Sequence, residues 1–529
     1  MSFNVRDKDL LGRIGKLRTK NGLLETPAFM PVINPLLQTI PPKRMRREFG
    51  CNVIITNSYI IRNQFGELPN LEVHKLLDYD GVVFTDSGAY QILVYGGVDV
   101  SQTEIIEFQK RINTDVGVIL DIPTGWEESR AQVEYTVTET LRRATDALSL
   151  ISDSETLWVG PVQGGRHLDL VSYSAKKIGE MPYDLHALGS PTEVMERYNY
   201  PVLVDMVMTA KKSLPPERPL HLFGAGHPMM FALAVAMGCD LFDSAAYTLY
   251  AKDMRYITNM GTILLDNLQY LPCSCPICRS RTAEDLKELP RGERQRLIAE
   301  HNLHVTMSEI DIVKQSIVEG TLWDLVETRA KAHPRMSSAV KRLGDYRFEL
   351  EKASPGFKGH GVFFYDYNSL PRPQVTRYRR QVKKNYATTK NMLLLIKAPD
   401  IKPFNQHPGF LNLKNKLTDA INEYEICFFA APYGVIPEKL AETYPLSQFE
   451  IAEPLDNETI RFTVEAVMDY AESKGIERVV LLTDSSDMGS ELQEAMETAD
   501  IDLTVIKTDS MWSNETIKRL KENELIKPR

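Results

Sequence analysis

The sequence predicts a parallel (β/α)8 barrel of the TIM-barrel class, followed by smaller α+β or α/β domains. Over roughly the first 340 residues, short apolar runs alternate with longer amphipathic stretches, which is typical of βα units and a parallel sheet. Most of these apolar runs end in an aspartate, a glutamine or a glycine-rich turn. In a parallel barrel the carboxyl ends of the strands gather on one face, where active sites are found. The pattern therefore predicts both the barrel and the place of its site.

An opening hairpin precedes the expected barrel strands. Its turn is formed by Lys20, Asn21 and Gly22, between strands at 14–18 and 23–29. The parallel strands that we expect next cover residues 52–56, 82–85, 116–120, 157–162, 183–187, 220–223, 239–242 and 262–265. Eight such units would close a barrel.

Three domains are expected along the chain. The barrel, with a zinc-binding insertion at 273–301, occupies residues 1–345. A stretch rich in turn-forming residues at 353–359 is typical of a linker, and a small domain at 355–420 and an α/β domain at 421–529 follow. The expected elements of the last domain are strands at 426–430, 478–482 and 503–506, and helices such as 458–474.

Composition indicates a globular protein of the cytoplasm. Hydrophobic residues make up 43% and charged residues 25% of the chain, and the N-terminus is polar from Arg6 onward, without a visible signal peptide. The longest apolar run, 231–239, is far too short to span a membrane. A net charge of −9 excludes a protein coated in positive charge, but nucleic acid needs only a local basic face. The stretches 43–47 and 377–384 are candidates, although such runs are more often solvated helix faces.

Polar residues follow the expected strands at the point where each one ends. Asp86, Asp121 and Asp243 each come directly after an apolar run, Gln163 begins a turn with two glycines, and Gly189 follows another run. A single aspartate at such a position can merely cap the next helix. Several on one barrel face favour a single convergent site.

This set of residues suits glycosyl transfer to or from a base. Of two carboxylates, one can attack an anomeric carbon while the other moves the proton of the leaving group, as in retaining enzymes. A third aspartate and an amide match the donor and acceptor edge of a purine-like base. Ser87 and the small residues after it allow close approach of the backbone, and Tyr90 offers a ring for stacking.

A separate cluster predicts a metal site. Cys273, Cys275 and Cys278 lie within six residues and are followed by His301 and His304. Three thiolates and one imidazole make a closed tetrahedral Zn2+ site that stabilises structure. The spacing differs from the C-x3-C-x2-C of a radical-SAM cluster. On spacing alone, either histidine could be the fourth ligand.

With these motifs the chain resembles the tRNA-guanine transglycosylases, and most closely their archaeal, archaeosine branch. The resemblance covers roughly residues 5–345 and rests on FTDSGAYQ, VILD, PVQGG, ALGS, HLFGAGHP, LFDSAAY, and CSCPIC with a later HN. It implies a pentosyltransferase, a tRNA-guanine(15) transglycosylase, that exchanges a guanine in the D-arm of archaeal tRNA for 7-cyano-7-deazaguanine (preQ0) in archaeosine biosynthesis.

The resemblance also implies roles for residues. Asp243 would attack the ribose C1′ and hold the tRNA covalently, and Asp86 would be the general acid and base, with the reverse assignment left open. The residues implied in base binding are Ser87, Tyr90, Asp121, Gln163, Gly164, Leu188 and Gly189, with Tyr90 as a stacking lid. One structural Zn2+ would be held by Cys273, Cys275, Cys278 and His301. Lys252 and Arg255, shortly after Asp243, are candidate phosphate contacts, although either could simply be exposed.

The implied partners are tRNA, guanine and preQ0, with homodimerisation through the zinc region. Archaeal members usually end in a PUA domain, and we expect none here because few residues follow the last strand. A separate PUA-domain protein, or the remaining domains, would then hold the tRNA. Two alternatives are an archaeosine synthase-like paralogue, which modifies the inserted base later, and a non-catalytic tRNA-binding subunit of a heteromeric transglycosylase. The paired aspartates argue against both.

Overall fold

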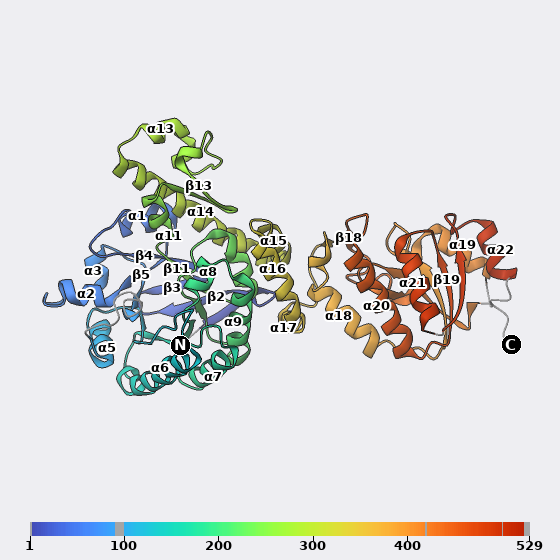
Figure 1. The fold of residues 1–529 in the computed structure, drawn as a ribbon, viewed down its shortest axis with the longest axis horizontal. Coiled ribbons are helices and arrows are strands. Elements are labelled where there is room, and N and C mark those ends of the chain that lie inside the picture. Colours follow the sequence, from blue (N-terminus) through green and yellow to red (C-terminus); the bar gives the residue numbers. More distant parts are fainter. Residues whose placement is uncertain (1–2, 90–99, 418–420, 500, 523–529) are drawn as a thin grey trace. The chain divides into compact units, whose positions relative to one another are not determined.

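A closed barrel of eight parallel strands forms the centre of the first of two units, Met1–Tyr346, in the computed structural model (Figure 1). The structure describes residues 3–89, 100–417, 421–499 and 501–522. In barrel order the strands are β4 (Ala28–Ile33), β5 (Val53–Asn57), β6 (Val82–Asp86), β7 (Val116–Val118), β8 (Leu157–Val162), β9 (Leu185–Leu188), β10 (Leu220–Leu222) and β11 (Leu241–Ser244). Pairing of β11 with β4 closes the barrel, which confirms the predicted fold class.

One predicted barrel strand is wrong. The run at 262–265 falls in β13 (Gly261–Leu264), which pairs antiparallel with β12 (Arg255–Thr258) in a hairpin outside the barrel. The eighth barrel strand is instead β4, whose first two residues fall within the expected hairpin strand at 23–29. Pro27 has no N–H to donate and separates the two strands, so that a new, buried strand begins at Ala28.

The N-terminal hairpin is confirmed and closes one end of the barrel. Strands β1 (Phe3–Asp9), β2 (Gly12–Thr19) and β3 (Gly22–Thr26) form an antiparallel sheet. Leu17 and Leu24 of this sheet belong to the same buried cluster as residues that begin barrel strands, such as Val82 and Leu185. The amino end of the barrel is therefore filled, and the carboxyl ends of the strands remain available for a site.

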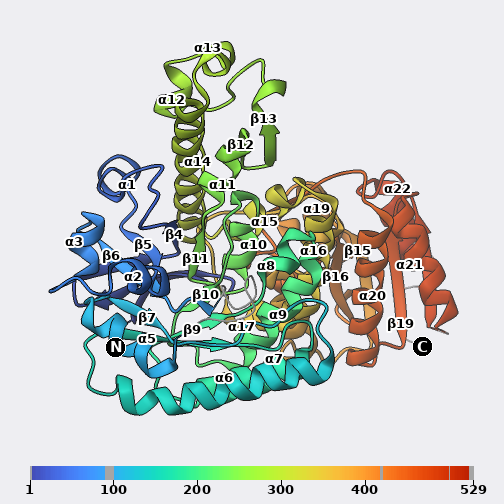
Figure 2. The same cartoon turned by 60° about the vertical axis from the view of Figure 1, so that its left-hand side comes forward.

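Helices surround the barrel, and the insertion that carries Cys273, Cys275 and Cys278 lies beside the longest described one, α14. The helices of this unit are α1 (Pro42–Phe49), α2 (Ser58–Phe65), α3 (Val73–Leu77), α5 (Gln102–Arg111), α6 (Arg130–Ile151), α7 (Leu168–Gly179), α8 (Thr192–Glu196), α9 (Tyr200–Ser213), α10 (Phe231–Ala236), α11 (Ala246–Lys252), α12 (Pro276–Arg279), α13 (Ala283–Glu288), α14 (Arg291–Glu319), α15 (Leu322–Ala330) and α16 (Pro334–Leu343). Figures 1 and 2 both show α13 and β13 near α14, and Figure 2 also shows α12 and β12 beside it. None of the helices within the described ranges is long and apolar enough to cross a membrane.

The second unit, Arg347–Arg529, contains a five-stranded sheet in the order β17-β16-β15-β19-β20. Its strands are β15 (Met392–Lys397), β16 (Tyr424–Ala430), β17 (Gly434–Pro437), β19 (Arg478–Thr483) and β20 (Asp502–Lys507), and β14 (Val362–Phe364) pairs separately with β18 (Phe449–Ile451). The helices are α17 (Arg347–Ala353), α18 (Pro373–Lys384), α19 (Pro408–Leu417), α20 (Asn457–Lys474), α21 (Asp487–Thr498) and α22 (Asn514–Glu522). Strands β15 and β16, which lie on either side of the expected boundary between 420 and 421, pair with each other and share one hydrophobic core.

Candidate functional site

A cavity of about 1080 Å³ lies at the carboxyl ends of the barrel strands. Its lining includes Asp86, Asp121, Gln163, Gly189 and Asp243, which the sequence placed at five different strand ends. The volume slightly exceeds the range of ligand pockets, roughly 300–1,000 Å³. The barrel therefore brings these side chains to one cavity.

Asp86 is the last residue of β6, and its carboxylate is fixed from two sides. The backbone N–H of Gly88 donates to Oδ1 at 2.9 Å, and Asn57 Nδ2 donates to Oδ2 at 3.2 Å. Burial raises the pKa of Asp86 to about 6 and outweighs the hydrogen bond from Gly88, and the negative charge of Asp243 acts in the same direction as burial. A substantial fraction of Asp86 is therefore protonated just below neutral pH, as a general acid requires.

Asp243, on β11, is held through a single oxygen. Its Oδ1 accepts a hydrogen bond from the backbone N–H of Gly224 at 3.0 Å and lies 2.7 Å from His221 Nε2. Its Oδ2 accepts no hydrogen bond from the described part of the chain. His221 is fully buried on β10, with its ring edge-on to Phe84 and Phe223. His221 lies in the expected strand 220–223, two residues before Phe223, and points into the barrel. Sequence reasoning nevertheless missed it as a site residue.

Asp121 and Gln163 form a second polar pair in the cavity. Gln163 Nε2 donates to Asp121 Oδ2 at 2.6 Å, and Gln163 Oε1 accepts from Ser190 Oγ at 2.9 Å. This second bond fixes which end of the amide faces Asp121. Burial raises the pKa of Asp121 to about 6 against the opposing effect of the Gln163 hydrogen bond, and the charge of Asp86 adds to the rise.

Position 189 needs a glycine because its backbone lies very close to the Gln163 side chain. A Cβ atom at this position would lie 2.2 Å from Gln163 Nε2, so that any larger residue would displace the amide. The glycine thus keeps the Asp121–Gln163 geometry.

Three further residues predicted to bind the base, Ser87, Gly164 and Leu188, do not line the cavity. Ser87 and Leu188 are buried, and Ser87 Oγ has no hydrogen-bond partner among the described residues. Gly164 has a φ of +143°, and a Cβ atom there would lie 2.5 Å from the backbone nitrogen of Val171, so its role in the structure is conformational. Tyr90 lies outside the described residues.

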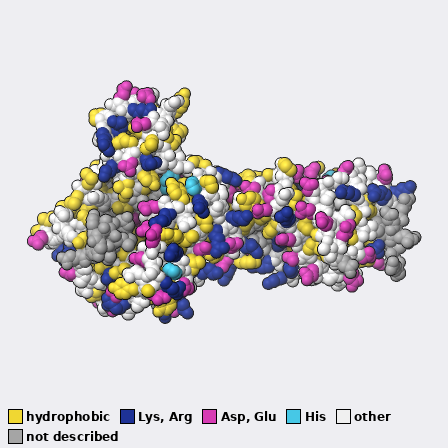
Figure 3. All heavy atoms as spheres, viewed as in Figure 1, with side chains coloured by type: hydrophobic (Ala, Val, Ile, Leu, Met, Phe, Trp, Pro, Cys, Tyr) yellow, Lys and Arg dark blue, Asp and Glu magenta, His cyan; other side chains and the backbone are white. Residues whose placement is uncertain are grey.

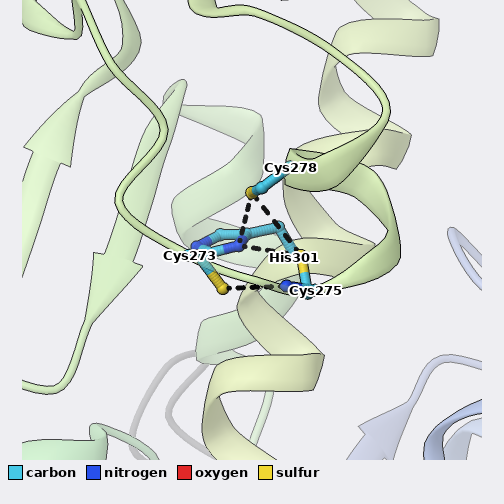
Figure 4. A group of neighbouring side chains, drawn as sticks. All are labelled: Cys273, Cys275, Cys278 and His301. Carbon is cyan, nitrogen blue, oxygen red and sulfur yellow. Dashed lines mark hydrogen bonds between the residues drawn. The ribbon is translucent and has the colours of Figure 1, made fainter.

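Three cysteines and one histidine converge in the insertion beside α14 (Figure 4). The donor atoms of Cys273, Cys275, Cys278 and His301 all lie within 4.8 Å of one another. His301 Nδ1 is 3.5 Å from the sulfur of Cys275 and 3.4 Å from that of Cys278, and the two sulfurs are 3.5 Å apart. Bonds of about 2.0–2.3 Å to a central tetrahedral ion would place the donors about 3.5–3.8 Å apart. The group could therefore bind one metal ion.

Neighbouring groups orient this cluster and identify its histidine. The other nitrogen of His301, Nε2, lies 2.9 Å from the carbonyl oxygen of Ile257 on β12, and this contact fixes the orientation of the ring. Tyr256 stacks on the His301 ring at 3.6 Å. His304, the other candidate on spacing, instead packs against Phe49 at 4.3 Å.

The two basic stretches considered as nucleic-acid surfaces are largely occupied by contacts within the protein. The ion pairs join Lys43 to Asp78, Arg44 to Glu48 and Glu300, Arg46 to Asp80, and both Arg377 and Arg380 to Glu351. Arg379 lies over the ring of Phe462 at 4.0 Å. On the face shown in Figure 3, basic and acidic side chains are interspersed. These stretches therefore have structural roles that account for their charge.

Comparison with known proteins agrees with this arrangement. The model of the family described as queuine tRNA-ribosyltransferase matches residues 8–335, and a family described as a domain of unknown function matches residues 375–524. A protein of Aeropyrum pernix named tRNA-guanine(15) transglycosylase is 44% identical over 457 residues, which cover 85% of this chain and 87% of the relative. Proteins with the same name from Sulfolobus acidocaldarius and Thermococcus onnurineus are 40% and 42% identical over 486 residues, covering 91% and 89% of this chain and 95% and 76% of theirs. The barrel, its strand-end carboxylates and these matches together show that the chain belongs to the queuine tRNA-ribosyltransferase family.

Proposed function

We propose that the protein is a tRNA-guanine transglycosylase, a pentosyltransferase that exchanges guanine 15 in the D-arm of tRNA for preQ0 in archaeosine biosynthesis. Relatives that are 40–44% identical carry the name of this activity. The observation that carries the proposal is the pair of carboxylates, Asp86 and Asp243, which line one cavity in different environments.

Exchange would proceed in two steps that use the same two residues. In the first, Asp243 Oδ2 attacks the ribose C1′, the bond from C1′ to guanine breaks, and protonated Asp86 gives its proton to the leaving base. In the second, Asp86 takes the proton from N9 of preQ0, this nitrogen attacks C1′, and Asp243 is released. The covalent intermediate retains the glycosidic bond energy, so the reaction needs no ATP. The raised pKa of Asp86 favours this assignment of roles over the reverse one.

The Asp121–Gln163 pair is suited to the edge of guanine. A carboxylate accepts hydrogen bonds from N1–H and the exocyclic amine, and an amide nitrogen donates to O6. PreQ0 has the same edge, whereas adenine reverses the pattern. Ser87, Gly164, Leu188 and Tyr90 stay predictions as further base contacts. Because the carboxylates lie inside the cavity, the target nucleotide must be everted from the folded tRNA to reach them.

Zinc is the metal that best suits the Cys3His cluster. Thiolate and imidazole ligands at these separations favour Zn2+, and four protein ligands leave no open position for catalysis. Bound zinc would tie the segment carrying the cysteines to α14. Its role would be structural, like that of other closed zinc sites. The homodimer and the separate PUA-domain partner remain predictions.

Incubation of the protein with unmodified tRNA and radiolabelled preQ0 tests the proposal. We expect incorporation of the label and release of guanine. No incorporation would favour the archaeosine synthase-like paralogue or the non-catalytic subunit. With tRNA alone, a covalent adduct on denaturing gels that disappears in Asp243→Ala but forms in Asp86→Ala would assign the nucleophile. The opposite pattern would assign it to Asp86.

A further inference from the structure

An exposed aromatic pair lies on the wall of the same cavity, outside the base-reading and catalytic residues. Tyr198, in the loop between α8 and α9, and His333, directly before α16, both line the cavity. Their rings are stacked, with centroids 4.6 Å apart and an angle of 21° between the planes. Tyr200 meets Tyr198 edge-on at 6.0 Å. Two segments far apart in the sequence thus form one aromatic surface.

The conformation of Tyr198 is unusual for a residue with this exposure. Its side chain is 47% exposed, whereas that of neighbouring Tyr200 is only 3% exposed and supplies the packing in this loop. Tyr198 also has a φ of +55°, in the left-handed region that residues with a Cβ atom rarely adopt. Its backbone N–H donates a hydrogen bond to the carbonyl oxygen of Met195 at 3.0 Å, and this bond stabilises the turn. The loop therefore presents this ring to solvent in a disfavoured backbone conformation, and such residues cluster at ligand sites.

The size of the cavity leaves room for more than the target base. At about 1080 Å³ it exceeds the roughly 300–1,000 Å³ that hold drug-sized ligands, and a single nucleobase is smaller than these. The target base is accounted for by the carboxylates and by Gln163. The aromatic pair remains as an unassigned part of the same space.

The chemistry of this part of the wall favours an aromatic face over a phosphate. Glu193 and Glu196 line the cavity on the Tyr198 segment and would repel a phosphate, although Lys252 on α11 adds one positive charge. His333 covers one face of the Tyr198 ring, and the exposure of Tyr198 leaves area for a second planar group. When a nucleotide is everted, its neighbours lose a stacking partner, and proteins commonly supply an aromatic ring in its place.

We propose that Tyr198, supported by His333, is a stacking subsite for a nucleobase adjacent to the target guanosine of the tRNA. The inference rests on the proposed function for its choice of ligand. It adds a second recognised base, held through its π-face, to the one that is exchanged. Lys252 would contact the phosphate between the two nucleotides.

Steady-state exchange with full-length tRNA tests this subsite. We expect Tyr198→Ala to raise KM for tRNA by roughly 5- to 100-fold, the range found when a base-stacking ring is removed, and to leave KM for preQ0 within about twofold. Tyr198→Phe keeps the ring and should match the wild type. Tyr173→Ala, which removes a tyrosine that is 51% exposed on α7 and does not line the cavity, is the matched control. Equal KM values for tRNA in Tyr198→Ala and the wild type would overturn the proposal.

A binding measurement separates this inference from the proposed function. tRNA carrying 2-aminopurine beside the target position should show quenched fluorescence with wild-type protein and with Asp243→Ala, and less quenching with Tyr198→Ala or Tyr198→Leu. Tyr198→Leu keeps an apolar contact in case the alanine variant folds poorly. Unchanged quenching in both would refute the subsite even if exchange is observed. If the wild type exchanges no base, the proposed function fails, and the titration still decides on the subsite.

Discussion

His221 Nε2 lies 2.7 Å from Asp243 Oδ1, so that a buried imidazole on β10 holds the carboxylate of the neighbouring strand. The backbone N–H of Gly224 donates to the same oxygen. Both contacts leave Oδ2 as the oxygen available to attack. A ring that is fully buried and packed against Phe84 can hold this orientation with little freedom to move.

Replacement of His221 by phenylalanine should therefore slow chemistry more than it weakens binding. We expect kcat to fall by roughly 10- to 100-fold, because small displacements of a reacting group have costs of this order, while KM for tRNA changes little. His221→Gln retains an N–H donor and should recover part of the rate. The measurement is the rate of covalent adduct formation in a single turnover. A phenylalanine variant with the wild-type rate would show that His221 has no positioning role.

The pKa of Asp86 predicts a pH-dependent stability. It is raised from an ordinary value of 3.8 to about 6, so the folded state binds this proton more tightly than the unfolded state does. This contribution to stability is complete below about pH 4 and is lost as the pH rises through about 6. Asp86→Asn removes the buried charge and should gain roughly 1–3 kcal/mol relative to the wild type at pH 8, but little at pH 4.

Urea unfolding at the two pH values measures this difference. Asp153→Asn, at an exposed position, controls for removal of a surface charge. If the free energy of unfolding of Asp86→Asn relative to the wild type were the same at pH 4 and pH 8, burial of the ionised Asp86 carboxylate would have no energetic cost, contrary to this prediction.

Gly189→Ala tests the close approach of the strand end to the Gln163 amide, which we propose binds the base. Its Cβ atom would lie 2.2 Å from Gln163 Nε2, and the amide would have to move away from Asp121. We expect KM for preQ0 to rise roughly 10- to 100-fold, since lost hydrogen bonds to a base edge cost about 1–3 kcal/mol. Gly292→Ala, where an added Cβ meets no atom within 4 Å, is the control. An unchanged KM would mean that the Asp121–Gln163 geometry is dispensable.

Loss of the metal cluster should destabilise the fold. We expect Cys275→Ser and His301→Ala to lose bound zinc and to lower stability by several kcal/mol, on the order found for structural zinc sites. His304→Ala leaves the four donors in place and should retain the metal. Metal content by elemental analysis, with thermal unfolding of the same samples, checks this. A Cys275→Ser protein that is as stable as the wild type but less active would point to a catalytic ion instead.

Local sequence patterns predicted the features that depend on neighbours along the chain. Asp86, Asp121 and Asp243 could be placed at strand ends because an apolar run stops abruptly before each of them. β4 was missed because Pro31 interrupts its apolar pattern and its start adjoins the hairpin. Contacts between distant segments carry no such signal. His221 and Asp243 lie on two neighbouring strands, and Tyr198 and His333 are much farther apart in the sequence. Neither contact could therefore be predicted from sequence spacing.

The adjacent residues His301 and Asn302 face two different parts of the molecule. His301 belongs to the metal cluster, while Asn302 Nδ2 donates to the carbonyl oxygen of Tyr247 on α11, the helix that begins just after Asp243. One turn of α14 thus links the Cys3His cluster to the segment that follows Asp243. On warming in the presence of a chelator, exchange activity should consequently disappear at a lower temperature than the far-ultraviolet circular dichroism of the barrel. Loss of activity at the lower temperature would show that removal of the metal disturbs the catalytic geometry before the fold is lost.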